Sequence, residues 1–580
     1  MTDHADWQRR AADKRAAQLE LIPPAWRLPA PSTSLLPSDV RDVPHTSGIL
    51  SDAELVITEE TDAQVVLDKI SRGEWTSTAV ATAFCKRAAI AQQLTNCLTE
   101  PLFDRALARA AELDAHFATT GCLVGPLHGL PVSLKEQFDI EGVESTMGFV
   151  SRIGHVSQDS AALVKVLESL GAVIHCRTNI PQALLSDESI NNVFGRVLNP
   201  LNTALTAGGS SGGEAALLAM RGSPLGVGTD LGGSIRKPAS FCGLYSLRPT
   251  SRRLPYAGAS NTFDGAEALE SVVGPMATSL ESLRVFMRAV ISAKPWEYDP
   301  RVVEREWDDE LARARGDEGK KCFAVMHSDG LVRPQPPLER GMRELAEKLS
   351  AAGHEVVEWE PLDHAGAQEL VSRIFDADGG EDVRRWIGNS GEPLLPQVFA
   401  SQYPAMSLYE SWQVSRAALS CALRRCGQLA HLASAPQLNK RRDAYRQRFL
   451  STYLSTRNRP DAQTNRPIDA IICPMCPHLA APHLDSPRPA GLITYTTVWS
   501  LLDLPCYTFP VGTVDPKLDP KPPPGAYEPM SDIDRDNWEV YSPERFERAP
   551  IVLQLVSPRR FREDELLGLG EVIERALSRA

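Results

Sequence analysis

Two glycine-rich stretches place serines where a nucleophile or an anion site could form. In the first, GGSSGG at 208–213 leads directly into a good helix former, EAALLAM. In the second, GVGTDLGGSIRKPASFCGLY at 226–245, Gly232 and Gly233 come directly before Ser234. Glycines inside a helix or strand cost stability, so such a pair should serve a purpose. Ser234 is therefore either a turn residue or a nucleophile beside its own oxyanion hole.

The first stretch has three interpretations when it is considered alone. Backbone N–H groups at a helix N-terminus could hold a phosphate, but the Lys-Ser/Thr ending of a phosphate loop is missing. GGSSG at 208–212 has the GxSxG spacing of a nucleophile elbow, although Asn199-Pro200 interrupts the strand that an elbow requires. A loop that only leads into a helix is the third. In each case Glu214, in the first helical turn, suits the helix dipole.

A lysine is the third candidate for chemistry. Lys135 ends the apolar, strand-like run LPVSL at 130–134. Its amine either reaches solvent or stays in the interior, where the loss of hydration lowers its pKa. A serine hydroxyl needs a partner that removes its proton during attack, and a neutral lysine can do so. The twelve histidines show no spacing that suggests one of them for this role.

Together these motifs resemble the three signatures of the amidase signature family of serine amidohydrolases. They are PVSLKEQFDI around Lys135, GGSSGGE around Ser210 and GTDLGGSIRKPASFCGL around Ser234, with spacings of 75 and 24 residues. The likeness runs from about residue 50 to near the C-terminus and includes TNIPQALLS at 178–186 and LLDLPCYTFPVG at 501–512. The N-terminal helix and IPPAWRL are most similar to the fungal acetamidase-like branch.

The resemblance implies a role for each of the three residues. Ser234 is the nucleophile that forms an acyl-enzyme, Lys135 is the base, and Ser210 is a bridging serine held on a cis peptide bond. Ser210 would pass a proton between the other two and deliver one to the leaving amine. The same resemblance assigns the oxyanion hole to the N–H groups of Leu231, Gly232, Gly233 and Ser234.

Supporting roles are expected from five further residues: Leu184, Ser211, Thr229, Asp230 and Arg236. A backbone group of Leu184 would contact the substrate, and Ser211 would orient the base or the bridging serine. The other three flank the nucleophile, where they either brace its loop or form a purely structural ion pair. Glu136 is interpreted as structural, because contact with Lys135 would keep the amine protonated.

The composition is that of an ordinary globular protein. The chain has 580 residues, of which 43% are hydrophobic and 23% charged. A net charge of −13 and a pI near 5.5 argue against a nucleic-acid binder, which normally has a basic face. The eleven cysteines lie mostly in apolar runs and indicate free thiols of a reducing compartment. CPMC at 473–476 has no second pair, so we expect neither a metal nor a redox site there.

Helix and strand patterns alternate from about residue 50 onward. A helix capped by Ser157 to Ser160 is expected over 161–170, and the buried strand AVIHC follows it at 172–176. A strand, a helix and another strand recur between 320 and 361, and DAIICP and IVLQLV are further buried strands. This alternation predicts an α/β fold with a large central mixed β-sheet covered by helices.

The sequence predicts one large domain behind a short N-terminal segment. Residues 1–48 contain a helix at 5–20 and a Pro/Ser-rich linker at 23–44. Residues 49–580 form the single domain, with a proline- and acid-rich surface insert at about 514–550. Because no secretory signal and no stretch of 18 apolar residues is found, a cytoplasmic location without membrane contact is expected.

The sequence therefore predicts an amide hydrolase that yields a carboxylic acid and ammonia or an amine. A small-molecule amide is the expected partner, with no cofactor, metal or nucleic acid. Family members often form homodimers, and both a monomer and a homodimer stay open here. Three alternative functions also stay open: an amidotransferase A-type subunit, which the charge of −13 disfavours, an esterase or carbamate hydrolase with the same triad, and a non-catalytic member, which the intact triad disfavours.

Overall fold

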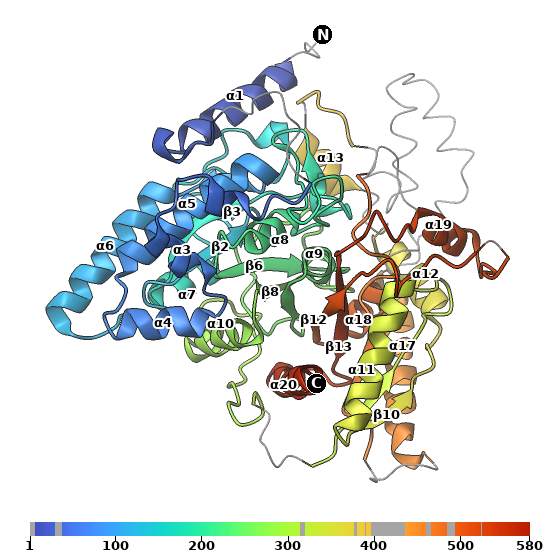
Figure 1. Cartoon of the computed structure of the whole chain (residues 1–580). Helices are drawn as coiled ribbons and strands as arrows, with labels where there is room; N and C mark the ends of the chain where they lie inside the picture. Colours follow the sequence, from blue (N-terminus) through green and yellow to red (C-terminus); the bar gives the residue numbers. More distant parts are fainter. Residues whose placement is uncertain are drawn as a thin grey trace, which may run out of the picture.

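Strands from the whole length of the chain form one eleven-stranded sheet across the middle of the computed structural model (Figure 1). The structure describes residues 6–29, 38–313, 319–375, 377, 380–388, 390–395, 435–459, 466–483, 494–523 and 525–579. In sheet order the strands are β1 (Leu98–Pro101), β3 (Val173–Thr178), β2 (Pro131–Lys135), β6 (Leu225–Asp230), β8 (Val272–Ala277), β7 (Tyr245–Arg248), β12 (Cys506–Thr513), β13 (Pro550–Val556), β11 (Ala470–Pro474), β9 (Cys322–Val325) and β10 (Glu355–Glu358).

The sheet is mixed, as the sequence predicts. β3, β2 and β6 run parallel at one end, and β11, β9 and β10 run parallel at the other. Antiparallel pairs join these two blocks through β8, β7, β12 and β13. A separate two-stranded ladder pairs β4 (Ile190–Asn191) with β5 (Gly195–Arg196). The α/β class and the mixed sheet are confirmed.

Helices cover both faces of the sheet (Figure 1). Neighbouring strand residues point to opposite faces, so Ile472 belongs to one buried cluster, with Leu345 and Leu567, whereas Ile471 belongs to another, with Leu370 and Trp499. The longer described helices are α1 (Asp6–Glu20), α3 (Asp52–Glu59), α4 (Ala63–Ser71), α5 (Ser77–Thr95), α6 (Phe103–Thr120), α7 (Ala162–Ser169), α8 (Gly212–Ala219), α9 (Arg236–Cys242), α10 (Leu280–Ser292), α11 (Pro336–Ala351), α12 (His364–Phe375), α13 (Glu381–Ile387), α17 (Ala435–Ser455), α18 (Thr494–Leu502), α19 (Asp532–Val540) and α20 (Glu563–Ser578).

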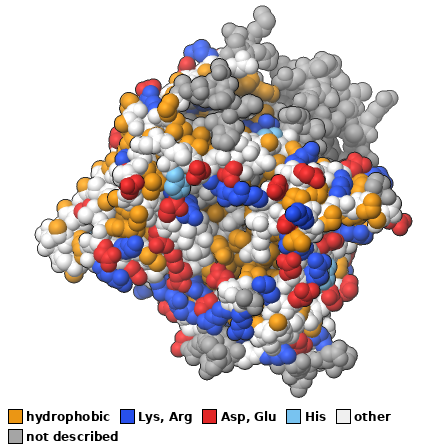
Figure 2. All heavy atoms as spheres, viewed as in Figure 1, with side chains coloured by type: hydrophobic (Ala, Val, Ile, Leu, Met, Phe, Trp, Pro, Cys, Tyr) orange, Lys and Arg blue, Asp and Glu red, His pale blue; other side chains and the backbone are white. Residues whose placement is uncertain are grey.

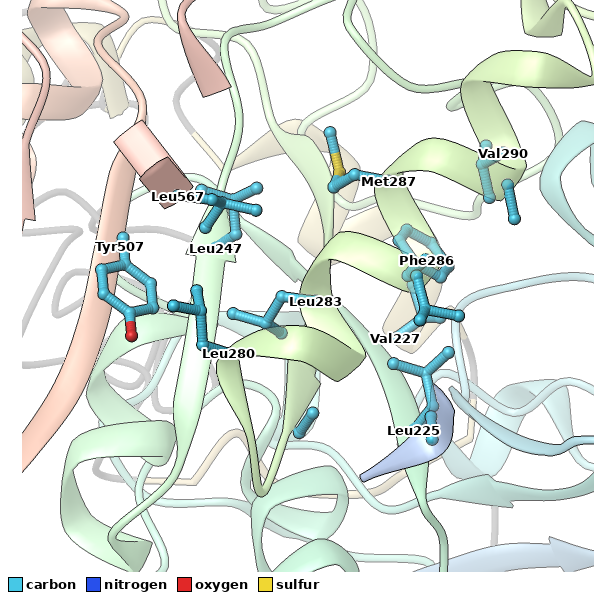
Figure 3. Packing of buried hydrophobic residues seen from close by; sticks show 14 of the residues in the cluster. Leu225, Val227, Leu247, Leu280, Leu283, Phe286, Met287, Val290, Tyr507 and Leu567 are labelled. Atoms are coloured by element: carbon cyan, nitrogen blue, oxygen red, sulfur yellow. The ribbon is translucent and has the colours of Figure 1, made fainter. Parts of the chain in front are cut away.

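The core that supports β6 is a layer of apolar side chains under this strand. From α10, Leu283 and Phe286 pack toward Val227 of β6 and Leu247 of β7 (Figure 3). All four are fully buried. Burying a side chain of this size contributes roughly 1.5–3 kcal/mol each. This layer supports β6, and the second glycine-rich loop follows the C-terminal end of that strand.

The start of α7 differs from the expected serine cap. The helix begins at Ala162, and no side chain caps it. Ser157 donates instead to Asp139 Oδ1 at 2.9 Å, and Ser160 accepts from the N–H of Glu141 at 3.0 Å. The predicted serine cap is therefore wrong, because both hydroxyls bond within the loop that precedes the helix.

The two peripheral segments are anchored to the body of the protein. In the insert at 514–550, Tyr541 and Phe546 are buried and pack with Phe241 and Met475. In the N-terminal segment, Gln18 of α1 donates to two carbonyl oxygens of β1, at 2.8 and 3.0 Å. The middle of the predicted linker, at 30–37, lies outside the described residues.

The surface and the thiols agree with an ordinary globular protein. Positive and negative side chains are intermixed over much of the face shown in Figure 2. The nine described cysteines are all free, and eight are buried, including Cys473 and Cys476 of the CPMC stretch. Among the helices that the structure describes, none combines the length and the apolar character needed to cross a membrane.

Candidate active site

Lys135 lies in the interior, at the C-terminal end of β2 between β3 and β6. Its side chain is fully buried. The Nζ atom donates to Ser210 Oγ at 2.7 Å and to Thr229 Oγ1 at 2.9 Å. The parallel pairing of β2 with β6 brings Lys135 and Thr229 to the same edge of the sheet. The amine therefore does not reach solvent, and it touches one of the two candidate serines directly.

The loop before α8 brings Ser210 to this amine. The peptide bond between Gly209 and Ser210 is cis. The loop lies directly against β6 at Gly228, where there is no room for a side chain. A Cβ atom on Gly228 would come within 2.7 Å of Ser211 Oγ. Ser211 donates its N–H to the carbonyl of Ser234 at 3.0 Å, which ties the two serine loops together. Its hydroxyl contacts the carbonyl of Thr229 at 3.5 Å rather than Lys135 or Ser210, which differs from its expected role.

The loop that follows β6 carries Ser234. Gly233 has φ +124°, a backbone conformation that favours glycine. The Asp230 carboxylate accepts from the N–H of Gly233 at 2.8 Å and from Arg236 Nε and Nη2 at 3.0 Å each. Burial alone would raise the pKa of Asp230. The charge of Arg236 beside it has the larger effect, and the resulting pKa is about 2. Asp230 and Arg236 thus form a buried ion pair that also braces the loop.

The hydrogen bonds of Asp230 engage one of the four N–H groups that were predicted for the oxyanion hole. The N–H of Gly233 points to Asp230 and is engaged there, so it is not an open donor in this structure. Within the described chain, the N–H groups of Gly232 and Ser234 carry no such internal bond. Leu231, Gly232 and Ser234 therefore stay the predicted donors of the expected set.

Burial alters the two ionisable groups closest to the serines. It lowers the pKa of Lys135 to about 7, although the carboxylates of Asp230 and Glu214 act in the opposite direction. Burial also raises the pKa of Glu214 to about 7, against hydrogen bonds from Ser133 and Thr178. A Lys135 with such a pKa is partly neutral at physiological pH, as a base requires.

Two glutamates near these motifs serve the scaffold. Glu214 lies in the first turn of α8, as expected, and its buried side chain also accepts from hydroxyls of β2 and β3. Glu136 is also buried, and it accepts from the N–H and the hydroxyl of Thr146. The carboxylate of Glu136 is thus held by the loop at 145–147.

Ser210 and Ser234 line one small cavity of about 50 Å³. Its wall includes Leu184 and Phe263, together with Phe375 from the end of α12. Leu184 has φ +62°, so its backbone is in the left-handed region and not in a strand or helix conformation. The rings of Phe263 and Phe375 meet edge to face at 5.4 Å. The serines therefore face a small cavity whose wall is partly apolar, at the two phenylalanines and the leucines, and partly polar.

The sequence analysis missed several residues of this region. Phe375 lies far along the chain in a helix without a motif, so no local signal identifies it. Lys237 and Asp187 form an ion pair of 2.8 Å in the cavity wall, and Lys237 lies inside the motif around Ser234 although no role was predicted for it. Gln137 lies inside PVSLKEQFDI without a predicted role, and its side chain accepts from the hydroxyl of Thr229. In the part of the chain that the structure covers, no group of three or more His, Cys, Asp or Glu side chains is arranged to hold a metal.

Known proteins resemble this chain over nearly its whole length. A sequence profile described as Amidase matches residues 79–567. The chain is 38% identical to a protein named Acetamidase from Emericella nidulans over 98% of both chains, and 37% identical to an Acetamidase from Aspergillus oryzae over 99% of both. Among solved structures, a fatty acid amide hydrolase matches with a TM-score of 0.84 and 31% identity, covering 99% of this chain and 95% of that one.

Proposed function

The chain belongs to the amidase signature family, and on that premise we propose that it hydrolyses carboxylic amides through an acyl-enzyme on Ser234. The products are a carboxylic acid and ammonia or an amine. The observation that carries this proposal is the buried amine of Lys135, 2.7 Å from Ser210 Oγ at the edge of the cavity that Ser234 lines. The names of the two acetamidases support an amide as the substrate.

The proposed reaction proceeds by proton relay. Neutral Lys135 takes the proton of Ser210 as Ser210 takes that of Ser234, and Ser234 Oγ attacks the amide carbon. The N–H groups that remain open in the nucleophile loop stabilise the negative charge on the carbonyl oxygen. When the tetrahedral intermediate collapses, the proton returns from Lys135 through Ser210 to the leaving nitrogen. Water then cleaves the ester by the same relay.

The purified single chain tests this proposal. It should release ammonia from acetamide or propionamide without any added protein. An amidotransferase A-type subunit would need partner chains for activity, so an inactive single chain that becomes active with such partners would favour that alternative. Paired esters and amides with the same acyl group separate an esterase from an amidase. A chain inert toward all of these substrates and toward a serine-directed fluorophosphonate would favour a non-catalytic member.

The rate is expected to rise with pH through about pH 7. Only the neutral amine of Lys135 accepts a proton, and burial lowers its pKa from 10.5 to about 7. Below this pKa the neutral fraction falls roughly tenfold per pH unit, and above it the neutral form predominates. kcat/KM should thus climb and then level off, as initial rates of ammonia release between about pH 5 and 9 will show. A profile that begins to rise only near pH 10 would contradict a buried lysine base.

The apolar part of the cavity wall offers a place for the acyl group. Phe263 and Phe375 line the cavity together with Ser234. Phe375→Ala should open the apolar wall and raise kcat/KM for hexanamide relative to acetamide by about tenfold or more. Phe117→Ala, in α6 and outside the cavity wall, serves as the matched control. An unchanged preference in the Phe375 variant would show that the acyl group does not lie against this ring.

A further inference from the structure

Gln137 lies two residues beyond Lys135, and its side-chain amide is bound at both ends. It is fully buried. Its Nε2 donates to the carbonyl of Ser260 and to the hydroxyl of Tyr256, at 3.0 Å each, and its Oε1 accepts from Thr229 Oγ1 at 2.5 Å. A carbonyl oxygen can only accept, so Ser260 determines which end of the amide faces it. The acceptor end of Gln137 must therefore face Thr229.

This orientation fixes the direction of the next hydrogen bond. The hydroxyl of Thr229 has a single proton, and Gln137 Oε1 can only accept it. Toward Lys135, 2.9 Å away, Thr229 is then only an acceptor. A neutral amine has two N–H donors and one lone pair, and one N–H is directed to Thr229. The other contact of the amine is Ser210 Oγ, at 2.7 Å.

We propose that Gln137 is a positioning residue that, through Thr229, keeps the lone pair of Lys135 available to the proton of Ser210. This inference rests on the proposed function. Without the acceptor at Gln137, Thr229 could rotate and donate to the lone pair, where it would compete with Ser210. Gln137 itself is not among the residues that line the cavity, so it acts on the base and not on the substrate.

A methionine at this position tests the role. Gln137→Met keeps the length of the side chain but removes the acceptor, and kcat should fall about 10- to 100-fold with little change in KM. Gln335→Met is the matched control. That glutamine is also buried, and its amide also bridges two segments, but it lies away from the cavity. A loss confined to KM, or a kcat within about twofold of the wild type, would overturn the proposal.

A double variant shows whether Gln137 acts through Thr229. In a Thr229→Val background, where no hydroxyl remains to be directed, adding Gln137→Met should lower kcat by less than about twofold further. Thr229→Ser, which keeps the hydroxyl, should retain most of the activity. If the fold-losses in kcat of the two single variants multiply in the double variant, Gln137 does not act through the hydroxyl of Thr229.

The charged variant Gln137→Glu adds a readout that does not depend on turnover. The charged groups that act on Lys135 are the carboxylates of Asp230 on β6 and Glu214 on α8. A third carboxylate, one hydroxyl away from the amine, should raise the pKa of Lys135 and move the rising limb of the pH profile upward. Titration of the lysine by NMR should show the same shift. If the pKa of Lys135 does not change in Gln137→Glu, the proposed link between Gln137 and Lys135 is wrong. A wild-type chain that is inert toward amides would instead refute the proposed function alone.

Discussion

Replacing Ser234 by alanine is expected to lower kcat by roughly 10⁴- to 10⁶-fold, as in other serine hydrolases that lose their nucleophile. The substitution removes one oxygen atom, and the loop keeps its shape because Asp230 and Arg236 hold it through other atoms. Folding should therefore be unchanged, as circular dichroism and thermal unfolding will show. Ammonia release gives the rate, and peptide mass spectrometry after fluorophosphonate treatment locates the modified serine.

The matched control for this experiment is Ser240→Ala. Ser240 lies on α9, close to Ser234 in sequence, and its hydroxyl donates to the carbonyl of Lys237. This variant should keep its activity and its labelling. If instead Ser234→Ala retained more than about a hundredth of the rate, or if the probe modified Ser210 in the wild type, Ser234 would not be the nucleophile.

The three candidate catalytic residues could be proposed from the sequence because each lies in a long local motif. The strand before Lys135 and the helix after Ser210 follow from hydrophobic periodicity and glycine placement. The alternation of helices and strands also predicts the α/β class. The resemblance adds the order of the motifs, and the structure brings Lys135 and Ser210 to within a hydrogen bond of each other.

The rest of the site depends on contacts between distant segments and on side-chain direction. Phe375 reaches the cavity from a helix outside every motif, and no periodicity reports which helix end closes a pocket. The N–H of Gly233 is engaged because the Asp230 carboxylate folds back onto it, which a one-dimensional pattern does not reveal. The orientation of Gln137 depends on the carbonyl of Ser260, which lies in the loop between β7 and β8.

Lys135→Met is expected to lower kcat/KM by roughly 10²- to 10⁴-fold, the usual contribution of a general base. Methionine fills a similar volume without an amine, and burying it removes the cost of a desolvated charge, so the variant should fold at least as stably. Its residual activity should lose the rise near pH 7, because that rise reports the neutral fraction of this amine. Ammonia release measured across the pH range tests both effects.

The pH signature separates a base from a residue that merely packs in the site. Lys86→Met, which removes a partly buried amine paired with Glu54 on α3, should leave both the rate and the profile unchanged. A loss of rate in Lys135→Met with the rise near pH 7 preserved would assign that rise to another group. Glu214 titrates in the same range, because burial raises its pKa to about 7. Glu214→Gln then identifies which of the two groups the profile follows.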